Sequence, residues 1–558
     1  MNHELEMKKY HWCCLAALLV LSVLIRTYPL FNYSLWGTDA GEYVYYTHRW
    51  VESGSMHRSI DGWAQAYPFF PGIFCLSGAF HLLTGVNVHG SVSTAPMALS
   101  LLTPLLVFLV VQRITLHENM ALLSAALMTF FAPIVYNYSQ PKPETLGFFL
   151  MVFLLWMLFI TNKENVGKML VMIVPFSGAL VITHHLSSLF LILLTLGGYF
   201  FSEMFRTRTT WENRFRAWFY LAFSTATVAY WFYGAAPFRD ERFLGAMGLP
   251  SYSILLAPYI AFFMAFVLIR ARRNMTDWMP KIDLGRNELR IQIILSLIPS
   301  TIVILILVYS VYYHIPGTDI TLGSNILLGL PLLLVGVFAL FSRIPLYIYR
   351  EGTLVMGWIS CVIMTALLGI ATGSSSLYTI RLVSFFMLPL VILFGIGVIR
   401  FQQLADPFSQ KNKVMAACIL LLLAVNIPLM YPSQETTSGY IEWTEHDALE
   451  ASHWTSYSIH GNILTDHRLS AALFSMGELN VSWTDGEPAY FSTSRQEAHE
   501  TLTAMDIRYI MMDHYMNETA TVADGVNPAP MDPELVRWYH SGYRLYVREN
   551  TEVYLIPM

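Results

Sequence analysis

The chain has 558 residues, of which 55% are hydrophobic and only 13% are charged, and its mean hydropathy is +0.49. A soluble globule of this size needs more charged surface, so the composition excludes a soluble enzyme and predicts a polytopic membrane protein. With a net charge of −5, no nucleic-acid partner is expected. The N-terminal MNHELEMKKYHW lacks the small-residue cleavage site of a secretory signal, so we expect no processed leader.

About thirteen apolar stretches are long enough to cross a bilayer as helices. They lie near residues 12–31, 91–112, 119–138, 145–161, 169–183, 185–203, 217–234, 250–270, 291–313, 324–342, 352–371, 378–399 and 414–431. The expected fold is therefore an α-helical transmembrane domain over residues 1–433, followed by a polar domain over residues 434–558.

The basic residues before the polar domain fall mostly on one side of the predicted membrane. Counting from Lys8 and Lys9 in the cytoplasm, the outer loops receive only Arg49, Arg58, Lys142, Arg239 and Arg242. This positive-inside asymmetry predicts a multi-pass protein of the cell membrane with a cytoplasmic N-terminus and an extracytoplasmic C-terminal domain.

One further apolar segment, residues 67–86, competes for a place among the spans. Counting it would move the basic loops at 206–216 and 270–290 to the outside, against the same rule. Its prolines and glycines instead predict broken helices that lie on or dip into the outer surface. The first outer loop, residues 31–90, thus contains interfacial helices.

The segment after residue 434 carries nineteen Asp and Glu against six Arg and no Lys. Its pattern predicts helices near 444–455, 467–475 and 494–505, strands at 462–465 and 507–512, and a final hairpin around Asn550. A small α/β domain fits this alternation. It contains no cysteine, so no disulfide holds it.

Two carboxylates follow the first span, in WGTDAGEYVYYTHRW. Asp39 and Glu42 are three residues apart and share one face of a helix. One interpretation is structural: Asp39 caps the helix and Glu42 completes a capping box. The other is catalytic, with a carboxylate at the membrane surface acting as a general base after partial burial raises its pKa.

The second outer loop, SQPKPETLGF, places a cation beside a carboxylate. Lys142 is the only lysine on the predicted outer side, lies between two prolines, and is followed by Glu144. A rigid turn with Glu144 at a helix N-terminus would explain the pattern structurally. The functional alternative is a cation that neutralises a lipid phosphate beside a second acidic residue.

His184 and His185 lie in the middle of a long apolar stretch, residues 169–203. As one helix this stretch would measure about 52 Å, too long for a single crossing of a roughly 30 Å core, so the chain should turn near the histidines. The turn places both at the outer surface, where they are either unremarkable interfacial residues or contacts to a phosphate or an acceptor.

Arg381 lies about one turn inside the twelfth predicted span, in GSSSLYTIRLVSFFMLPL. Arginine at the centre of a membrane helix costs about 2.5 to 3.5 kcal/mol on insertion scales, and less near an interface. Snorkelling to the interface is one explanation. A buried anion is the other, and a lipid phosphate is the natural anion at that depth.

Together these motifs resemble the GT-C superfamily of glycosyltransferases, which use sugars linked to polyprenyl phosphates. The resemblance rests on Asp39 in GTDAGEYVYYTHRW, on the following YPFFPGIFCLSGAFHLLTG, on Glu144, on Arg381 and on the C-terminal outer domain. It covers the whole architecture, although each motif is short.

The resemblance implies the partners and a mechanism. A dolichyl- or undecaprenyl-phosphate sugar would be the donor, and a lipid-linked glycan, a protein or another cell-envelope molecule the acceptor. Asp39, with Glu42 and Glu144, would form the catalytic group, and Lys142, His184, His185 and Arg381 would bind the donor phosphate. No metal ligand or certain cofactor is assigned, and dependence on a divalent cation stays open.

Three alternatives remain. Oligosaccharyltransferases carry WWDYG in the outer domain, and the nearest string here, SWTDG at 482–486, lacks the tandem tryptophans, so transfer of a single sugar is preferred. A transporter or flippase could also carry buried charges, although usually near the membrane midplane. A catalytically silent relative could keep the fold as a scaffold.

Overall fold

A computed structural model of the chain describes residues 9–54, 67–205, 210–236, 252–273, six positions between 305 and 313, and residues 330–342, 352–372, 379–404, 411–431, 443–477, 481–482, 486–523 and 529–556. The chain forms two compact units. The helical unit contains Met1–Ile25, Leu99–Asn137 and Leu146–Tyr431, and the mixed unit contains Arg26–Ala98, Tyr138–Thr145 and Pro432–Met558.

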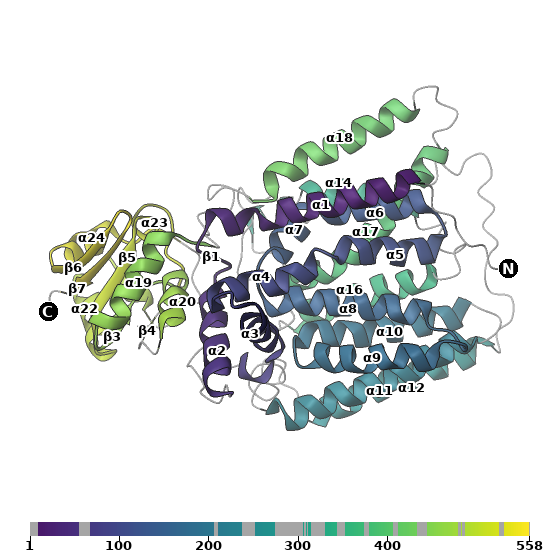
Figure 1. Ribbon diagram of the computed structural model, residues 1–558, viewed down its shortest axis with the longest axis horizontal. Coiled ribbons are helices and arrows are strands. Elements are labelled where there is room, and N and C mark those ends of the chain that lie inside the picture. The colour runs from purple at the N-terminus through teal and green to yellow at the C-terminus, as the bar shows by residue number, and fades with distance from the viewer. Residues whose placement is uncertain are drawn as a thin grey trace. The chain divides into compact units, whose positions relative to one another are not determined.

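The helical unit is a bundle of apolar helices (Figure 1). Its described helices are most of α1 (Lys9–Asn32), α5 (Thr103–Thr115), α6 (Glu118–Phe130), α7 (Ala132–Tyr138), most of α8 (Pro143–Ile160), α9 (Val166–Val181), α10 (His185–Phe205), α11 (Trp211–Tyr233), α12 (Tyr252–Arg273), α14 (Leu330–Ala339), α16 (Gly352–Thr372), α17 (Thr379–Leu404) and α18 (Lys411–Leu429). A helix therefore occupies every predicted span except 291–313, most of which lies outside the described residues.

Five described helices are long and apolar enough to cross a membrane, or six if a bent pair counts as one span. The bent pair is α6 with α7, which meet at 59° within the predicted span 119–138. At the break, the Ala132 amide donates to Asn426 Oδ1 at 2.8 Å, so the backbone group released by the bend is satisfied. The protein is a multi-pass membrane protein, and the number thirteen stays a prediction.

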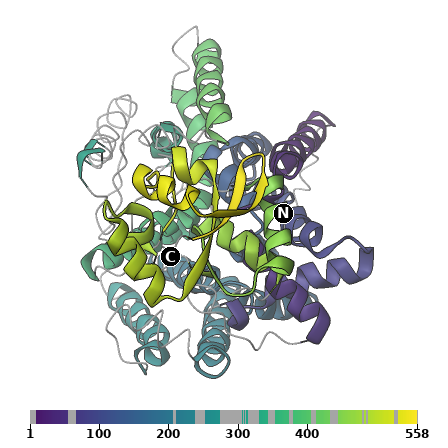
Figure 2. The same cartoon turned by 90° about the vertical axis from the view of Figure 1, so that its left-hand side faces the viewer.

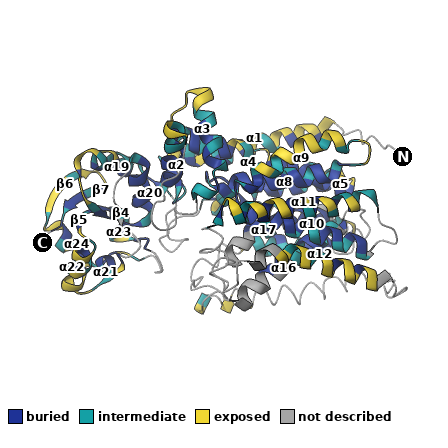
Figure 3. Ribbon diagram, turned by 90° about the horizontal axis from the view of Figure 1, so that it is seen from below, coloured by how far each residue is buried: buried dark blue, intermediate teal, exposed yellow. Residues whose placement is uncertain are grey.

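Small residues let the helices of the bundle approach closely. Gly197 on α10 faces Gly357 on α16, where a Cβ on either glycine would lie within 2.7 Å of the other's carbonyl oxygen. Such small-residue contacts are typical of helices packed in membranes. Figure 3 shows exposed residues along α1 and α9. They include large apolar ones such as Leu24 and Val171, as expected where lipid rather than water covers them.

The mixed unit begins with the last turns of α1, then β1 (Leu35–Trp36), α2 (Ala40–Ser53), α3 (Gly72–Thr84) and α4 (Val88–Ser100). The helical structure of segment 67–86 is broken near its prolines, as predicted: a 3-10 turn at 67–69 is followed, after Phe70 and Pro71, by the 13-residue helix α3. Its last turn exposes Leu82 and Leu83 (Figure 3). A helix of this length is too short to cross a bilayer, in agreement with the rejection of a span here.

The C-terminal part of the mixed unit, yellow and yellow-green in Figure 2, is built around a five-stranded sheet. The strand order is β4-β3-β5-β7-β6. The strands are β3 (Asn462–Leu464), β4 (Val481–Ser482), β5 (Ile507–Asp513), β6 (Tyr543–Arg548) and β7 (Thr551–Leu555). The β3 strand pairs in parallel with β4 and β5, and β7 is antiparallel to β5 and β6. The predicted strands and the final hairpin at Asn550 are confirmed.

Helices cover this sheet and close its apolar core. They are α19 (His446–Ser458), α20 (His467–Met476), α21 (Glu487–Phe491), α22 (Arg495–Ala504), α23 (His514–Glu518) and α24 (Pro533–His540). Ile463, Ile510 and Val553 from the sheet are fully buried against Leu473 of α20 and Leu535 of α24. This core fixes the first turn of α20, which begins at His467.

Candidate active site

Asp39 immediately precedes α2, but its side chain does not cap the helix. Its backbone has φ −88° and ψ 4°, outside the extended conformation that lets an N-cap side chain reach the first amides. The Asp39 Oδ2 atom instead accepts hydrogen bonds from Tyr67 Oη at 2.9 Å and from Tyr43 Oη at 3.3 Å. The capping interpretation is therefore wrong, and the carboxylate is held by two phenols.

The other carboxylate oxygen of Asp39 faces a histidine of the C-terminal domain. His467 Nε2 lies 3.4 Å from Asp39 Oδ1, within ion-pair distance when the imidazole is protonated. The Asp39 side chain keeps 35% of its surface exposed, and that of His467 only 13%. A substrate can therefore reach the carboxylate while the histidine stays largely covered.

The two phenols are held in a cluster of aromatic rings. Tyr43 and Tyr67 meet edge to face at a centroid distance of 5.2 Å, and Tyr46 and Phe74 complete the group. Burial raises the pKa of both Tyr43 and Tyr67 well above the usual value for tyrosine, and the Asp39 charge raises each further. Both phenols thus keep their protons and act as donors to Asp39.

Glu42 lies one turn into α2 and is 2% exposed. Its Oε2 atom is buried and has no hydrogen-bond partner among the described residues. Burial, followed by the charge of Asp39, raises the pKa of Glu42 well above its usual value. The two carboxyl groups therefore differ: Asp39 is partly exposed and surrounded by donors, whereas Glu42 favours the protonated form.

The second loop approaches the first at Gly37, which has a φ of +102° that favours glycine. A Cβ on Gly37 would lie 3.7 Å from the Cβ of Gln140. In the same loop Lys142 Nζ lies 4.0 Å from Glu144 Oε2, and Glu144 falls in the first turn of α8. Lys142 and Glu144 therefore belong to a loop whose Gln140 packs beside Gly37 of the first loop.

The remaining predicted residues belong to the helical unit. The chain turns between α9 and α10 as predicted, and His184 Nδ1 lies 2.8 Å from Ser187 Oγ. The His184 ring also stacks on Phe385 of α17 at 6.5 Å, and His185 begins α10. Arg381 falls in the first turn of α17, and its side chain lies outside the described part of the chain. Their grouping with Asp39 stays a prediction.

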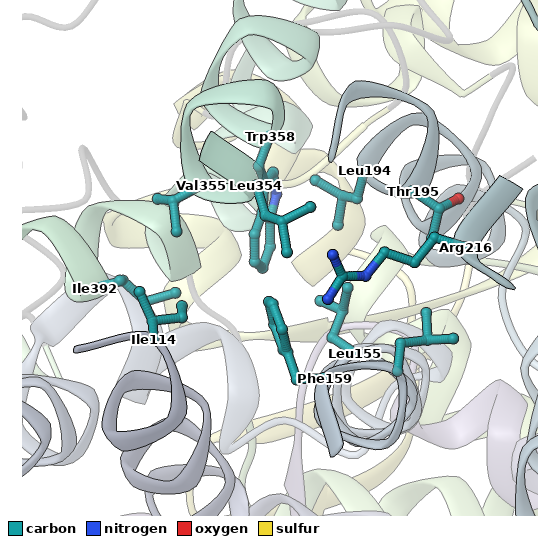
Figure 4. A pocket seen from close by; sticks show the side chains of 11 residues that line it. Ile114, Leu155, Phe159, Leu194, Thr195, Arg216, Leu354, Val355, Trp358 and Ile392 are labelled. Carbon is teal, nitrogen blue, oxygen red and sulfur yellow. The ribbon is translucent and has the colours of Figure 1, made fainter. Parts of the chain in front are cut away.

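The helical unit also contains a cavity that holds none of the predicted site residues (Figure 4). Its walls are apolar except for Arg216, Thr195 and Trp358. Arg216 Nη1 donates to Asn213 Oδ1 at 3.1 Å, and Asn213 in turn donates to Glu203. Asn213 thus links the arginine to the Glu203 carboxylate within the bundle.

Sequence reasoning missed Tyr43, Tyr67 and His467 as parts of the site. Tyr43 shares a helix face with Asp39, four residues away, and this spacing was available as a signal. Nothing local links Asp39 to His467, which is 428 positions later in the chain. Within the described residues, no group of three or more His, Cys, Asp or Glu side chains is arranged to hold a metal ion.

The fold is similar to that of solved structures of an archaeal oligosaccharyltransferase. The apo oligosaccharyltransferase of Archaeoglobus fulgidus superposes with a TM-score of 0.58 at 13% identity, over 99% of this chain and 75% of that chain. The A. fulgidus oligosaccharyltransferase AglB in complex with an inhibitory peptide and a dolichol-phosphate gives 0.56 at 13% identity, over 90% and 69%.

A further solved structure, ArnT from Cupriavidus metallidurans bound to undecaprenyl phosphate, gives a TM-score of 0.44 at 12% identity over 98% of both chains. No protein-family model and no curated protein sequence matches this chain. At these identities the likeness is one of fold.

Proposed function

We propose that this protein is an integral-membrane glycosyltransferase that transfers a sugar from a polyprenyl-phosphate donor to a lipid-linked glycan or protein acceptor on the outer face of the membrane. The observation that carries the proposal is the partly exposed Asp39 carboxylate, held by Tyr43, Tyr67 and His467 in a chain with the oligosaccharyltransferase fold. A carboxylate fixed in this way is suited to receive a proton.

The reaction would be one direct displacement with inversion at the anomeric carbon. The acceptor hydroxyl or amide attacks that carbon and gives its proton to Asp39. The bond between the anomeric carbon and the phosphate oxygen breaks, and the electron pair leaves with the polyprenyl phosphate. Lys142 and Arg381 would stabilise the developing negative charge of the leaving group, with His184 and His185 as further contacts.

The donors around Asp39 define how it would act. The two phenols fix the orientation of the Asp39 carboxylate, and its partial exposure leaves room for an acceptor to approach it. A neutral Glu42 beside it adds no second negative charge against the approaching donor phosphate. Asp39 is therefore the proposed base, and Glu42 supports the site as a buried neutral neighbour.

The second candidate is an oligosaccharyltransferase-like activity, in which a lipid-linked glycan is transferred to a peptide. The fold match to the A. fulgidus enzyme over nearly the whole chain favours it. The altered SWTDG string speaks against it. The two candidates share the donor chemistry and differ in the sugar and the acceptor.

An in-vitro transfer assay with purified protein tests the proposal. A panel of radiolabelled polyprenyl-phosphate monosaccharides and lipid-linked oligosaccharides is offered with lipid-linked glycan and sequon-peptide acceptors in separate arms. Transfer of a single sugar supports the first candidate, and transfer of an oligosaccharide to peptide supports the second. No transfer in any arm by folded protein, with Asp39→Asn as the blank, contradicts both.

A further inference from the structure

The C-terminal domain contributes the side chain of His467 to the surroundings of Asp39. The reaction proposed above assigns no role to this histidine. His467 is the first residue of α20, and its Nε2 atom lies 3.4 Å from Asp39 Oδ1. The two phenols contact Oδ2 of Asp39, so the histidine is the described partner of the other oxygen. Oδ2 thus accepts hydrogen bonds from the phenols, and Oδ1 faces the imidazole at ion-pair distance without hydrogen-bond geometry.

The backbone of His467 is fixed from several directions. Its amide donates to the Val522 carbonyl at 2.9 Å, and the preceding Asp466 caps α20 by accepting from the Leu469 amide at 2.9 Å. The following Arg468 is 1% exposed and forms ion pairs with Asp466 and Asp513. An imidazole on such a rigid turn is placed by the fold of the domain.

The helix that carries His467 is also locked against the helix that follows Asp39. Gly41 of α2 contacts the backbone of Ala471 on α20 so closely that a Cβ would lie 1.8 Å from the Ala471 carbonyl oxygen. Figure 1 shows α2 and α20 side by side within the mixed unit. Asp39 and His467 therefore lie at the N-terminal ends of two helices in direct backbone contact.

Asp39 is the carboxylate that the structure places at ion-pair distance from His467. On α20, Asp466 is committed to Arg468, and on α2, Glu42 favours its neutral form and Tyr43 and Tyr67 keep their protons. The charged side chains of α19, which packs on α20, have partners elsewhere. These pairs are His446 with Glu450, Glu450 with Arg548, and Asp447 with the Asn550 amide.

From this geometry we propose that His467 is a positioning residue: it orients the Asp39 carboxylate and makes the C-terminal domain an integral part of the transfer site. This inference rests on the proposed function. It assigns a role in the reaction to a domain whose contribution the sequence leaves open. The histidine touches neither donor nor acceptor and acts through Asp39.

A matched pair of substitutions tests the role. Gln keeps an N–H donor near the position of Nε2, whereas Met has a similar length and no donor. We expect His467→Met to lower kcat by about 10- to 100-fold, because the Asp39 carboxylate loses the polar group that faces Oδ1, with little change in donor KM. His467→Gln should recover most of the rate. His460→Met, at an exposed position of the same domain, is the control.

The pH dependence gives a readout that packing alone does not move. If His467 acts through Asp39, the acid limb of the kcat/KM profile should move in His467→Met and much less in His467→Gln. Equal rates and profiles in His467→Met and His460→Met would overturn the role. Equal losses in the Gln and Met variants would also overturn it, since shape alone would then matter. If His467→Met does not fold, His467→Ala replaces it.

A thermal-stability cycle separates this inference from the proposed function. Melting temperatures are compared for the wild type, Asp39→Asn, His467→Met and the double variant. A double variant less destabilised than the sum of the singles shows that the side chains interact, whether or not transfer is detected. Non-additive melting temperatures without any transfer would contradict the proposed function but not the contact between Asp39 and His467. If transfer depends on Asp39 but the melting-temperature changes of the two single variants are additive, the role of His467 is contradicted.

Discussion

Asp39 is the residue on which the chemistry depends, and its contacts define a sharp substitution. Asp39→Asn keeps the size of the side chain and an oxygen that can accept from Tyr67, but it removes the charge and the proton acceptor. Turnover should fall by roughly 10² to 10⁴, the usual worth of positioned general-base catalysis. Donor affinity and melting temperature should change little.

Transfer assays, donor-binding assays and thermal melts on the same preparation check this expectation. Near-normal transfer by Asp39→Asn would mean that the carboxylate is not the base. Loss of activity that merely follows a drop in melting temperature would point to a structural role for the side chain.

Glu42 gives a pH-dependent prediction. Its pKa in the folded protein is raised, so the native state holds a proton that the unfolded chain releases above the ordinary value of 4.5. Stability contributed at this site is therefore complete below pH 4.5 and declines as pH rises toward the raised pKa. Glu42→Gln mimics the protonated form and removes this decline.

Melting curves at pH 4 and pH 8 test the sign. The melting temperature of Glu42→Gln should rise relative to wild type between the two values, and transfer should be largely kept. If Glu42→Gln proves more damaging to transfer than Asp39→Asn, the roles of the two carboxyl groups are reversed.

At the residue scale, the sequence predicted which carboxylates matter but not what holds them. Asp39 and Glu42 were identified from position and spacing, and the capping alternative failed because the Asp39 side chain turns to Tyr67, 28 residues away. Hydrogen bonds across such separations leave no periodic trace in one sequence. His467 is the extreme case, since only the packing of α20 on α2 brings it to Asp39.

The contact between α2 and α20 determines the geometry at the level of elements. Because a Cβ at Gly41 would lie 1.8 Å from a backbone carbonyl that cannot move alone, Gly41→Ala must push the helices apart. Overpacking of this kind costs about 1 to 3 kcal/mol. We expect a lower melting temperature and a larger loss of transfer than the stability change explains.

Gly178→Ala is the matched control for this substitution. Gly178 is in α9, and a Cβ there meets no atom within 4 Å. Alanine favours a helix by about 1 kcal/mol over glycine, so the control should be neutral or slightly stabilising. Equal behaviour of the two variants would show that the helices can separate without consequence for the site.

Most elements followed from local pattern. The turn before His185, the strands of the C-terminal sheet and the short length of α3 all reflect apolar periodicity or a length too short or too long for one crossing. The predicted span at 91–112 is divided into α4 and α5, which together pass as one apolar stretch, Val88–Thr115. Pro96 and Pro104 lie near this division, and their effect on one boundary was not predicted.

For the whole molecule, the remaining prediction is the orientation in the membrane. The distribution of Lys and Arg predicts that Ser34 and Asn517 face outward and Arg214 inward. Single cysteines at these positions, in a variant lacking the five native cysteines, are labelled with an impermeant maleimide in sealed cells. We expect labelling at the first two positions only, and cytoplasmic labelling of Asn517→Cys would contradict the topology.

The mixed unit joins Arg26–Ala98 and Tyr138–Thr145 to the segment from Pro432 onward, and this has a consequence for the order of synthesis. Ribosomes add roughly 5 to 20 residues per second, so about 430 further residues need some 20 to 90 seconds. During that time α20 has not yet been synthesised, so the residues of α2 from Ala40 to Thr47 that it helps to bury are more exposed. Asp39 meets His467 only when translation is nearly finished, so a nascent chain cannot assemble this site early.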